Sequence, residues 1–177
     1  METKNCISTR RSIRSFTDKA VSENDIRIIA ALAQNAPSWK NSQTVRLCAV
    51  TDKKLLEEIC AVLPERNGKI AGSAPLIFAV SSVTGKSGFS KEGTADSIYG
   101  EGYTFFDCGL FVQSLCLAAC DLGLGTVIMG LFDPEKIRPL LNIPQGENII
   151  ALIPCGYAAE EPKAPPRLPT DEILRLI

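Results

Sequence analysis

The chain has 177 residues, 45% of them hydrophobic, and a formal net charge of −1, which is typical of a single globular domain spanning residues 1–177. A charge this close to zero argues against nucleic-acid and anionic-membrane partners. Histidine is absent, which excludes Ser-His-Asp and Cys-His nucleophiles and histidine-ligated zinc. The seven cysteines have no metal-binding spacing and no secretion signal is evident, so we expect free thiols, no metal and a cytoplasmic protein.

In the first half of the chain, apolar periodicity and turn residues predict a helix, a strand, a second helix, a turn or short helix, and a strand. Ser22 is a good N-cap for the first helix. The unbroken run of Leu, Ile, Phe and Val in the last segment predicts a strand that is buried on both faces. The expected ranges are Glu23–Ala33, Arg46–Thr51, Lys53–Leu63, Pro64–Ser73 and Pro75–Ser82.

In the second half, a polar loop over Val83–Gly102, either disordered or a lid, precedes an apolar segment over Thr104–Leu122. That segment is apolar on nearly every side, which predicts a central helix buried all round. Its polar residues argue against a membrane span. Beyond it we expect a strand, a helix, a strand, a proline-rich extended arm and a last short helix: Thr126–Met129, Pro134–Leu141, Asn148–Gly156, Tyr157–Pro169 and Asp171–Ile177. Alternating helices and strands favour a sandwich of two or three layers.

The segment Thr9–Phe16 carries three arginines and three hydroxyl side chains. Arginine presents a rigid fork of donors that matches phosphate, and hydroxyls add further donors. The segment therefore predicts a site for a small dianion, with a solvated basic terminus as the alternative. The chain has no glycine-rich nucleotide motif, so if it is an enzyme, a bound organic cofactor is expected to carry the chemistry.

Four motifs stand in a characteristic order along the chain. They are Arg10–Phe16, Ala36–Gln43, Gly123–Pro144, and Ile150–Pro162 with a late Arg167. Together they resemble the nitroreductase family of FMN-dependent oxidoreductases over essentially the whole chain. The resemblance implies an α+β fold with a central mixed β-sheet flanked by helices, a buried central helix and a C-terminal extended arm. It also implies a homodimer with FMN at the subunit interface. NAD(P)H would be the electron donor and a nitroaromatic or quinone the acceptor, in a ping-pong reaction.

The resemblance also implies roles for particular residues. Arg10, Ser12 and Arg14, with Arg11 in the same motif, would hold the FMN phosphate, ribityl chain or ring edge, and Arg167 would reach back from the arm. Pro37, Ser38 and Asn41 of the other subunit would pack on the flavin, with Trp39 helping to wall the cleft. Met129 and Gly130 would lie against the isoalloxazine edge, and Lys69 would sit near N1 and C2=O. No side chain is expected to act as a catalytic residue itself.

Each assignment has a simpler structural alternative. Ser38 and Asn41 are common turn residues, Trp39 suits an ordinary core, and Lys69 suits a solvated surface. Asp107, in the apolar helix, suits a hydrogen-bonded structural group. Gln43 is followed by Thr44 where the family commonly has proline, which leaves substrate preference open. Two further functions remain open: a flavin-binding protein without turnover, used for storage or regulation, and a non-flavin module for a phosphorylated metabolite.

Overall fold

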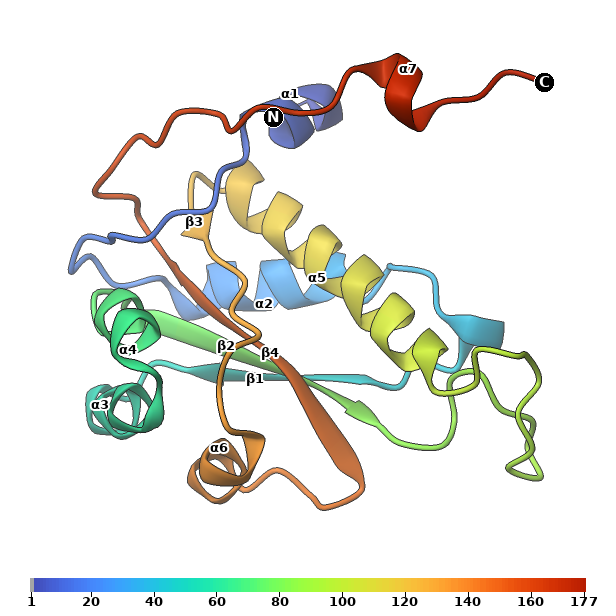
Figure 1. Ribbon diagram of the computed structural model, residues 1–177. Helices are drawn as coiled ribbons and strands as arrows, with labels where there is room; N and C mark the ends of the chain where they lie inside the picture. The colour runs from blue at the N-terminus through green and yellow to red at the C-terminus, as the bar shows by residue number, and fades with distance from the viewer. Residues whose placement is uncertain (1) are drawn as a thin grey trace.

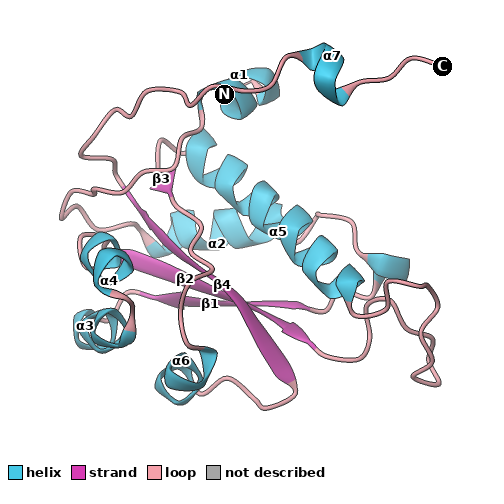
Figure 2. Cartoon of the chain, viewed as in Figure 1, coloured by secondary structure: helices cyan, strands magenta, loops and turns pink. Residues whose placement is uncertain are grey.

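A four-stranded sheet with the order β1-β2-β4-β3 separates two layers of helices in the computed structural model, which describes residues 2–177 (Figure 1). Helices α2 and α5 cover one face, and α3, α4 and α6 cover the other (Figure 2). The elements are α1 Thr3–Thr9, α2 Glu23–Ala33, η1 Trp39–Asn41, β1 Val45–Val50, α3 Lys53–Val62, α4 Glu65–Ala71, β2 Leu76–Val83, α5 Gly102–Asp121, β3 Gly125–Thr126, α6 Pro134–Leu141, β4 Glu147–Gly156 and α7 Thr170–Ile173.

Strand β2 lies at the centre of both hydrophobic cores. Leu76, Phe78 and Val80 point into the core formed with α2 and α5. Ile77 and Ala79 point into the core formed with α3 and α6. Because successive side chains of a strand face opposite sides, a strand covered on both faces must be apolar throughout. This confirms the prediction of a doubly buried strand and gives the sandwich three layers.

The sheet is antiparallel between its named strands, with β2 paired to both β1 and β4, and β3 paired to β4. A parallel pairing enters as an isolated bridge between Ser12 and Thr126, which makes the sheet mixed. Helices on antiparallel strands define the α+β class that was predicted. After β4 the chain becomes an exposed arm without regular structure until α7 (Figure 1).

Capping side chains fix where three of the helices begin. Ser22 Oγ accepts the Asp25 backbone N–H at 3.0 Å at the start of α2, as predicted. Asp52 accepts the Leu55 N–H at 2.8 Å at the start of α3. Asp133 caps α6 in the same way, with proline at the first helical position.

Four expectations need correction. The helix α1 was not predicted, and β3 covers only Gly125–Thr126. Met129 joins the sheet as an isolated bridge to Leu152 instead of continuing a strand. The loop between β2 and α5 is ordered, because Ser87 is fully buried and donates to Asp107 at 2.6 Å. The final helix α7 has only four residues.

Within a single chain, helix α5 is buried on one side, so the burial all round expected from the sequence would need a partner on its other side. Its inner side, including Val112 and Leu115, packs in the core with α2 and the sheet. Phe105 and Phe106 are 57% and 60% exposed on the outer side. Within residues 2–177, α5 is the helix long and apolar enough to cross a membrane, although half of it is buried within the fold, as in a core helix.

Gly125 sets how closely the N-terminal segment lies against the sheet. The Ile13 backbone N–H donates to the Thr126 carbonyl at 3.0 Å. A Cβ at Gly125 would lie 2.5 Å from Ile13 Cγ1, which is too close for any real pair of carbon atoms. The absence of a side chain at Gly125 therefore allows the arginine-bearing segment to dock on β3.

We predict that Gly125→Ala destabilises the fold by about 1–3 kcal/mol, because the added methyl must displace Ile13 or the backbone beside it. Gly146→Ala is the matched control, since a Cβ at Gly146 would meet nothing within 4 Å. Urea unfolding of both variants checks the prediction. Equal midpoints for the two variants would contradict it.

Candidate functional site

The predicted phosphate-binding arginines lie at the C-terminal end of α5. Arg10 and Arg11 line a cavity of about 400 Å³ together with residues of the β3 turn and the start of the arm. The complete lining is Thr9, Arg10, Arg11, Ile13, Cys120, Gly123, Leu124, Gly125, Ala158, Glu161 and Pro162. Ser12 is adjacent, in the bridge to Thr126. Two of the three arginines of the motif thus line one concavity, whereas Arg14 and Ser12 lie outside its lining.

The guanidinium groups of this cluster are free of carboxylate partners in the part of the chain that is described. Arg11 Nη1 donates to the carbonyls of Ser8 and Arg10 at 2.7 and 2.9 Å, and Arg14 Nη1 donates to the Ser12 carbonyl at 3.3 Å. Glu160 accepts the backbone N–H of Arg14, so this carboxylate lies beside the segment and bonds to its backbone, not to a guanidinium. The cluster keeps a positive charge available for a ligand.

The predicted flavin-edge residues follow on the same chain. Met129 is 4% exposed and exchanges two hydrogen bonds with Leu152, at 2.8 and 3.0 Å. Gly130 is exposed, and a Cβ there would meet nothing within 4 Å, so its backbone faces open space. Thr126 and Met129 are three residues apart in extended chain, which spans about 10 Å. The arginine-bearing segment, docked on Thr126, and the open backbone of Gly130 therefore lie at the two ends of one short stretch of chain.

Lys69 lies on α4 near this edge but is engaged elsewhere. Its Nζ pairs with Glu65 one helical turn away at 2.7 Å, and its side chain is 75% exposed. The neighbouring Asn67 donates its Nδ2–H to the Leu131 carbonyl at 2.9 Å, which ties α4 to the segment after Gly130. The geometry thus brings α4 to the edge, while Lys69 has the contacts of a surface ion pair.

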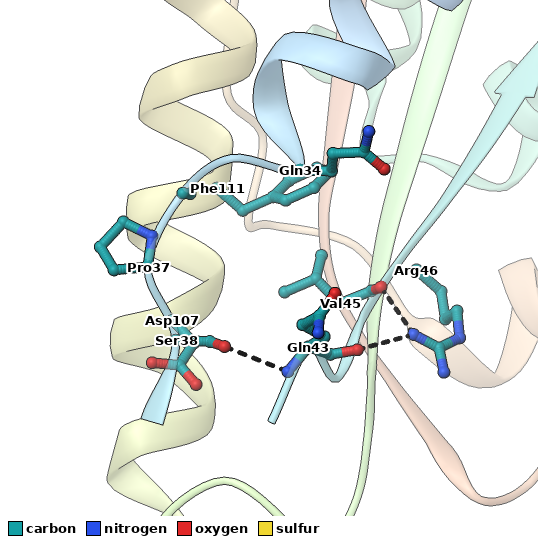
Figure 3. Close-up of a pocket in the computed structure, with 9 residues that line it drawn as sticks. Gln34, Pro37, Ser38, Gln43, Val45, Arg46, Asp107 and Phe111 are labelled. Carbon is teal, nitrogen blue, oxygen red and sulfur yellow. Dashed lines mark hydrogen bonds between the residues drawn. The ribbon is translucent and has the colours of Figure 1, made fainter. Parts of the chain in front are cut away.

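The second predicted group lies at the other end of α5. Pro37 and Ser38 line a cavity of about 180 Å³ with Asp107 (Figure 3). Its full lining is Gln34, Ala36, Pro37, Ser38, Gln43, Val45, Arg46, Asp107 and Phe111. Ser38 Oγ accepts the Gln43 backbone N–H at 3.0 Å, which closes the loop on itself.

The loop from Pro37 to Gln43, called here the 37–43 loop, has an unusual backbone. Lys40, Asn41 and Gln43 have φ angles of 45°, 54° and 48°. The left-handed region costs a non-glycine residue on the order of 1 kcal/mol or more, and asparagine tolerates it best. Such strain persists only where surrounding contacts impose it, and it is concentrated at functional sites.

Trp39, the only tryptophan in the chain, anchors this loop. Its ring centroid is 4.1 Å from that of Tyr103 on α5. Its backbone N–H donates to both carboxylate oxygens of Asp107, at 3.0 and 3.1 Å. Trp39 is therefore a partly buried anchor on α5.

One chain does not bring the two groups together. Trp39 contacts α5 at Asp107, whereas Arg10 shares its cavity with Cys120. These two α5 positions are 13 residues apart, which is about 20 Å along the helix axis. The segments accordingly lie at opposite ends of α5 in Figure 1.

Arg167 lies on the exposed arm, five residues after Pro162 of the arginine cavity. Its Nη1 donates to the adjacent Pro166 carbonyl at 3.5 Å, and no carboxylate pairs with it in residues 2–177. Within a single chain, Arg167 therefore lies exposed on the arm and contacts none of the other predicted residues.

The cysteines offer no alternative chemistry at these sites. All seven are free thiols. Burial raises the pKa of Cys155 to about 12 and that of Cys108 to about 11, so both remain protonated and non-nucleophilic at neutral pH. Burial also raises the pKa of Cys116, with Arg10 acting weakly in the opposite direction. No cluster able to hold a metal ion occurs in the part of the chain that the structure describes.

Two residues of this region were not among the predicted site residues. Asp107 and Ser87 bond to each other and join the 37–43 loop, the loop before α5, and α5 itself. The sequence carried one relevant signal, an acidic residue within an apolar helix. It was interpreted as a hydrogen-bonded structural group, and the contacts confirm that part of the interpretation.

Comparison with known proteins agrees with this arrangement. The model of the nitroreductase family matches residues 7–157. A Thermus thermophilus NADH dehydrogenase is 30% identical over 199 residues, covering 98% of this chain and 95% of its own length. A nitroreductase-family structure from Streptococcus pneumoniae superposes with a TM-score of 0.87 at 27% identity, covering 99% of this chain and all of that one. A structure from Desulfovibrio desulfuricans in complex with FMN superposes with a TM-score of 0.82 at 29% identity, covering 98% of this chain and 95% of its own.

The fold is therefore that of the α+β flavin oxidoreductases, and the chain belongs to the nitroreductase family. As a member it is an oxidoreductase.

Proposed function

We propose that this protein binds FMN and uses it to pass electrons from NAD(P)H to a small planar acceptor such as a nitroaromatic or a quinone. The observation that carries the proposal is the arginine segment, which pairs with no carboxylate in residues 2–177 and docks on Thr126, four residues before the open backbone of Gly130. A phosphorylated cofactor with an apolar ring would use both the arginines and the open backbone, whereas a small phosphorylated metabolite would use only the arginines.

The residues fit FMN in charge and in shape. Within residues 2–177 no carboxylate pairs with the guanidinium groups of Arg10, Arg11 and Arg14, and charge-assisted bonds to a phosphate would satisfy them. The open backbone at Gly130 allows close approach by a planar ring. Glu161 is the carboxylate of the cavity lining, and the arginines around it outweigh its charge.

In the reaction, the residues of the chain itself would bind the cofactor, orient its ring and exclude water from it. When bound, FMN would supply the hydride chemistry, which matches a chain without histidine and with protonated buried thiols. Arg10, Ser12 and Arg14 would hold the phosphate and ribityl end. Met129 and Gly130 would carry the ring edge, with Lys69 contributing positive charge after leaving Glu65.

We further propose a homodimer in which the 37–43 loop of one chain completes the FMN site of the other. Its Pro37, Ser38, Trp39 and Asn41 would cover the ring, and the arm would carry Arg167 toward the phosphate. The 20 Å separation of the two groups along α5 supports a second copy as the means of joining them. Two chains packed with their α5 helices antiparallel would place each loop beside the other chain's arginine cluster.

The exposed surface supports the same proposal. The chain exposes 10696 Å², whereas a compact monomer of 19.1 kDa exposes about 8,400 Å² by the usual scaling with mass. The surplus includes large apolar side chains on α5 and on the arm, such as Phe105, Phe106, Leu168, Ile173 and Leu176. Apolar surface of this extent marks an interface.

A flavin-binding protein without turnover is the second candidate function, since its binding site would be the same. The family of oxidoreductases to which the chain belongs favours turnover. The seven free thiols favour a reducing cytoplasm as its location.

Arg10→Ala and Arg14→Ala should each weaken FMN binding about ten- to a hundredfold, because a charge-assisted phosphate contact contributes roughly 1.5–3 kcal/mol. Titration of the apo-protein with FMN, followed by quenching of flavin fluorescence, measures the change. Arg27→Ala on α2, an exposed arginine that pairs with Glu23 and belongs to none of the predicted groups, serves as the control. Unchanged affinity in both cluster variants would end the phosphate assignment.

Sedimentation equilibrium should show a homodimer at all working concentrations. Phe105→Asp with Phe106→Asp should shift the protein toward monomer and reduce FMN retention, because charge on the exposed face of α5 opposes its burial. A wild-type monomer of 19.1 kDa that retains FMN would contradict the shared site.

Steady-state kinetics should be ping-pong, because one cleft beside Gly130 must admit donor and acceptor in turn. Double-reciprocal plots against NAD(P)H at several quinone concentrations should be parallel. Converging lines would show that both substrates bind together. An FMN-loaded protein that neither nicotinamide reduces would support storage or regulation instead.

A further inference from the structure

Asp107 is a buried carboxylate that three segments share. It lies on α5 and is 2% exposed. It accepts the Trp39 backbone N–H on both oxygens, at 3.0 and 3.1 Å, and the Ser87 hydroxyl at 2.6 Å. Ser87 is itself fully buried. No lysine or arginine forms an ion pair with Asp107 in residues 2–177, so these hydrogen bonds are what stabilises the carboxylate there.

The backbone that Asp107 holds leads directly into the strained turn. Trp39 immediately precedes Lys40 and Asn41, the first two residues with positive φ. The Asn41 N–H donates to the Ser38 carbonyl at 3.0 Å, and the Ser42 N–H donates to the Trp39 carbonyl at 2.8 Å. The bonds to the Trp39 amide therefore hold the start of this turn in place, although non-glycine residues disfavour its left-handed backbone.

Asp107 also ties this turn to the loop before α5. The buried Ser87, which belongs to the loop before α5, donates to Asp107. On the surface, Lys40 of the 37–43 loop pairs with Asp96 of the loop before α5 at 2.6 Å. The surface pair is largely solvated, with Lys40 63% exposed, and contributes little. The buried bonds to Asp107 are the stronger link between the two loops.

We propose that Asp107 is a positioning residue for the flavin site: it holds the 37–43 loop in the conformation from which Ser38 and Asn41 reach the FMN of the other subunit. This inference rests on the proposed function. Asp107 itself lies behind the loop and acts through Trp39. Misplacement of a cofactor-facing group by about 1 Å costs up to a hundredfold in rate, which sets the scale of the effect.

The test compares Asp107→Leu, Asp107→Asn and Ser87→Ala with Thr104→Val. Thr104 is a fully buried polar residue one turn earlier on α5, and its hydroxyl donates to Glu101 at 3.3 Å, so it is the matched control. Asparagine retains an acceptor for the Trp39 N–H, and its amide can donate to Ser87 Oγ. Ser87→Ala removes only one of the hydrogen bonds to Asp107, so this milder variant keeps the test valid if Asp107→Leu does not fold.

The first readout needs no cofactor. In apo-protein, hydrogen exchange at the amides of the 37–43 loop should accelerate at least tenfold in Asp107→Leu and remain near wild type in Asp107→Asn. Fluorescence of the single Trp39, stacked on Tyr103, should change in the leucine variant alone. Protection equal to that of Thr104→Val would overturn the placement of the loop by Asp107.

The second readout is the flavin. In FMN-loaded enzyme, kcat should fall about 10- to 100-fold in Asp107→Leu with a shifted flavin absorbance, severalfold in Ser87→Ala, and less than threefold in Asp107→Asn. A leucine variant with wild-type kcat and spectrum would overturn the proposal. If wild type itself failed to bind FMN, the proposed function would fall, while the exchange experiment would still decide whether Asp107 orders the loop.

Discussion

The length and one-sided packing of α5 determine how this protein can build a site. The helix has 20 residues and buries one side against the sheet and α2. Each end holds a different group of polar residues, the 37–43 loop at Asp107 and the arginine segment near Cys120. A rigid helix cannot bring its own ends together, so the two groups stay about 20 Å apart within one chain. The outer face, with Phe105 and Phe106 exposed, is at the same time the surface available to a second copy.

Each group depends on a specific contact that holds its backbone in place. On one side, the absence of a side chain at Gly125 lets Ile13 dock on β3 and brings the arginines to their cavity. On the other, Asp107 and Ser38 hold a turn with three left-handed, non-glycine residues. The strained 37–43 loop is thus held by the well-packed helix α5. Support from a rigid element keeps the side chains of a site in precise positions.

The predictions from sequence succeeded where a local pattern determines the structure. The apolar run of β2 and the cap at Ser22 each carry a signal within a few residues. The one-sided burial of α5 within a single chain has no signal in the sequence, because its exposed phenylalanines are as apolar as its buried residues and composition does not tell an outer face from a core. The role of Asp107 requires knowing that residues 39, 87 and 107 meet in space, and no spacing in the sequence encodes that contact.

A hybrid dimer tests most directly whether the site is shared between two chains. One chain would carry Arg10→Ala and Arg14→Ala, and the other, with a different affinity tag, Ser38→Ala and Asn41→Ala. Each homodimer should be severely impaired, because all of its sites lack one group. The purified hybrid should recover about half of the wild-type NAD(P)H-dependent activity and FMN content, since one of its two sites takes intact arginines from one chain and an intact loop from the other. A hybrid no more active than its parent homodimers would show that each chain builds its site alone.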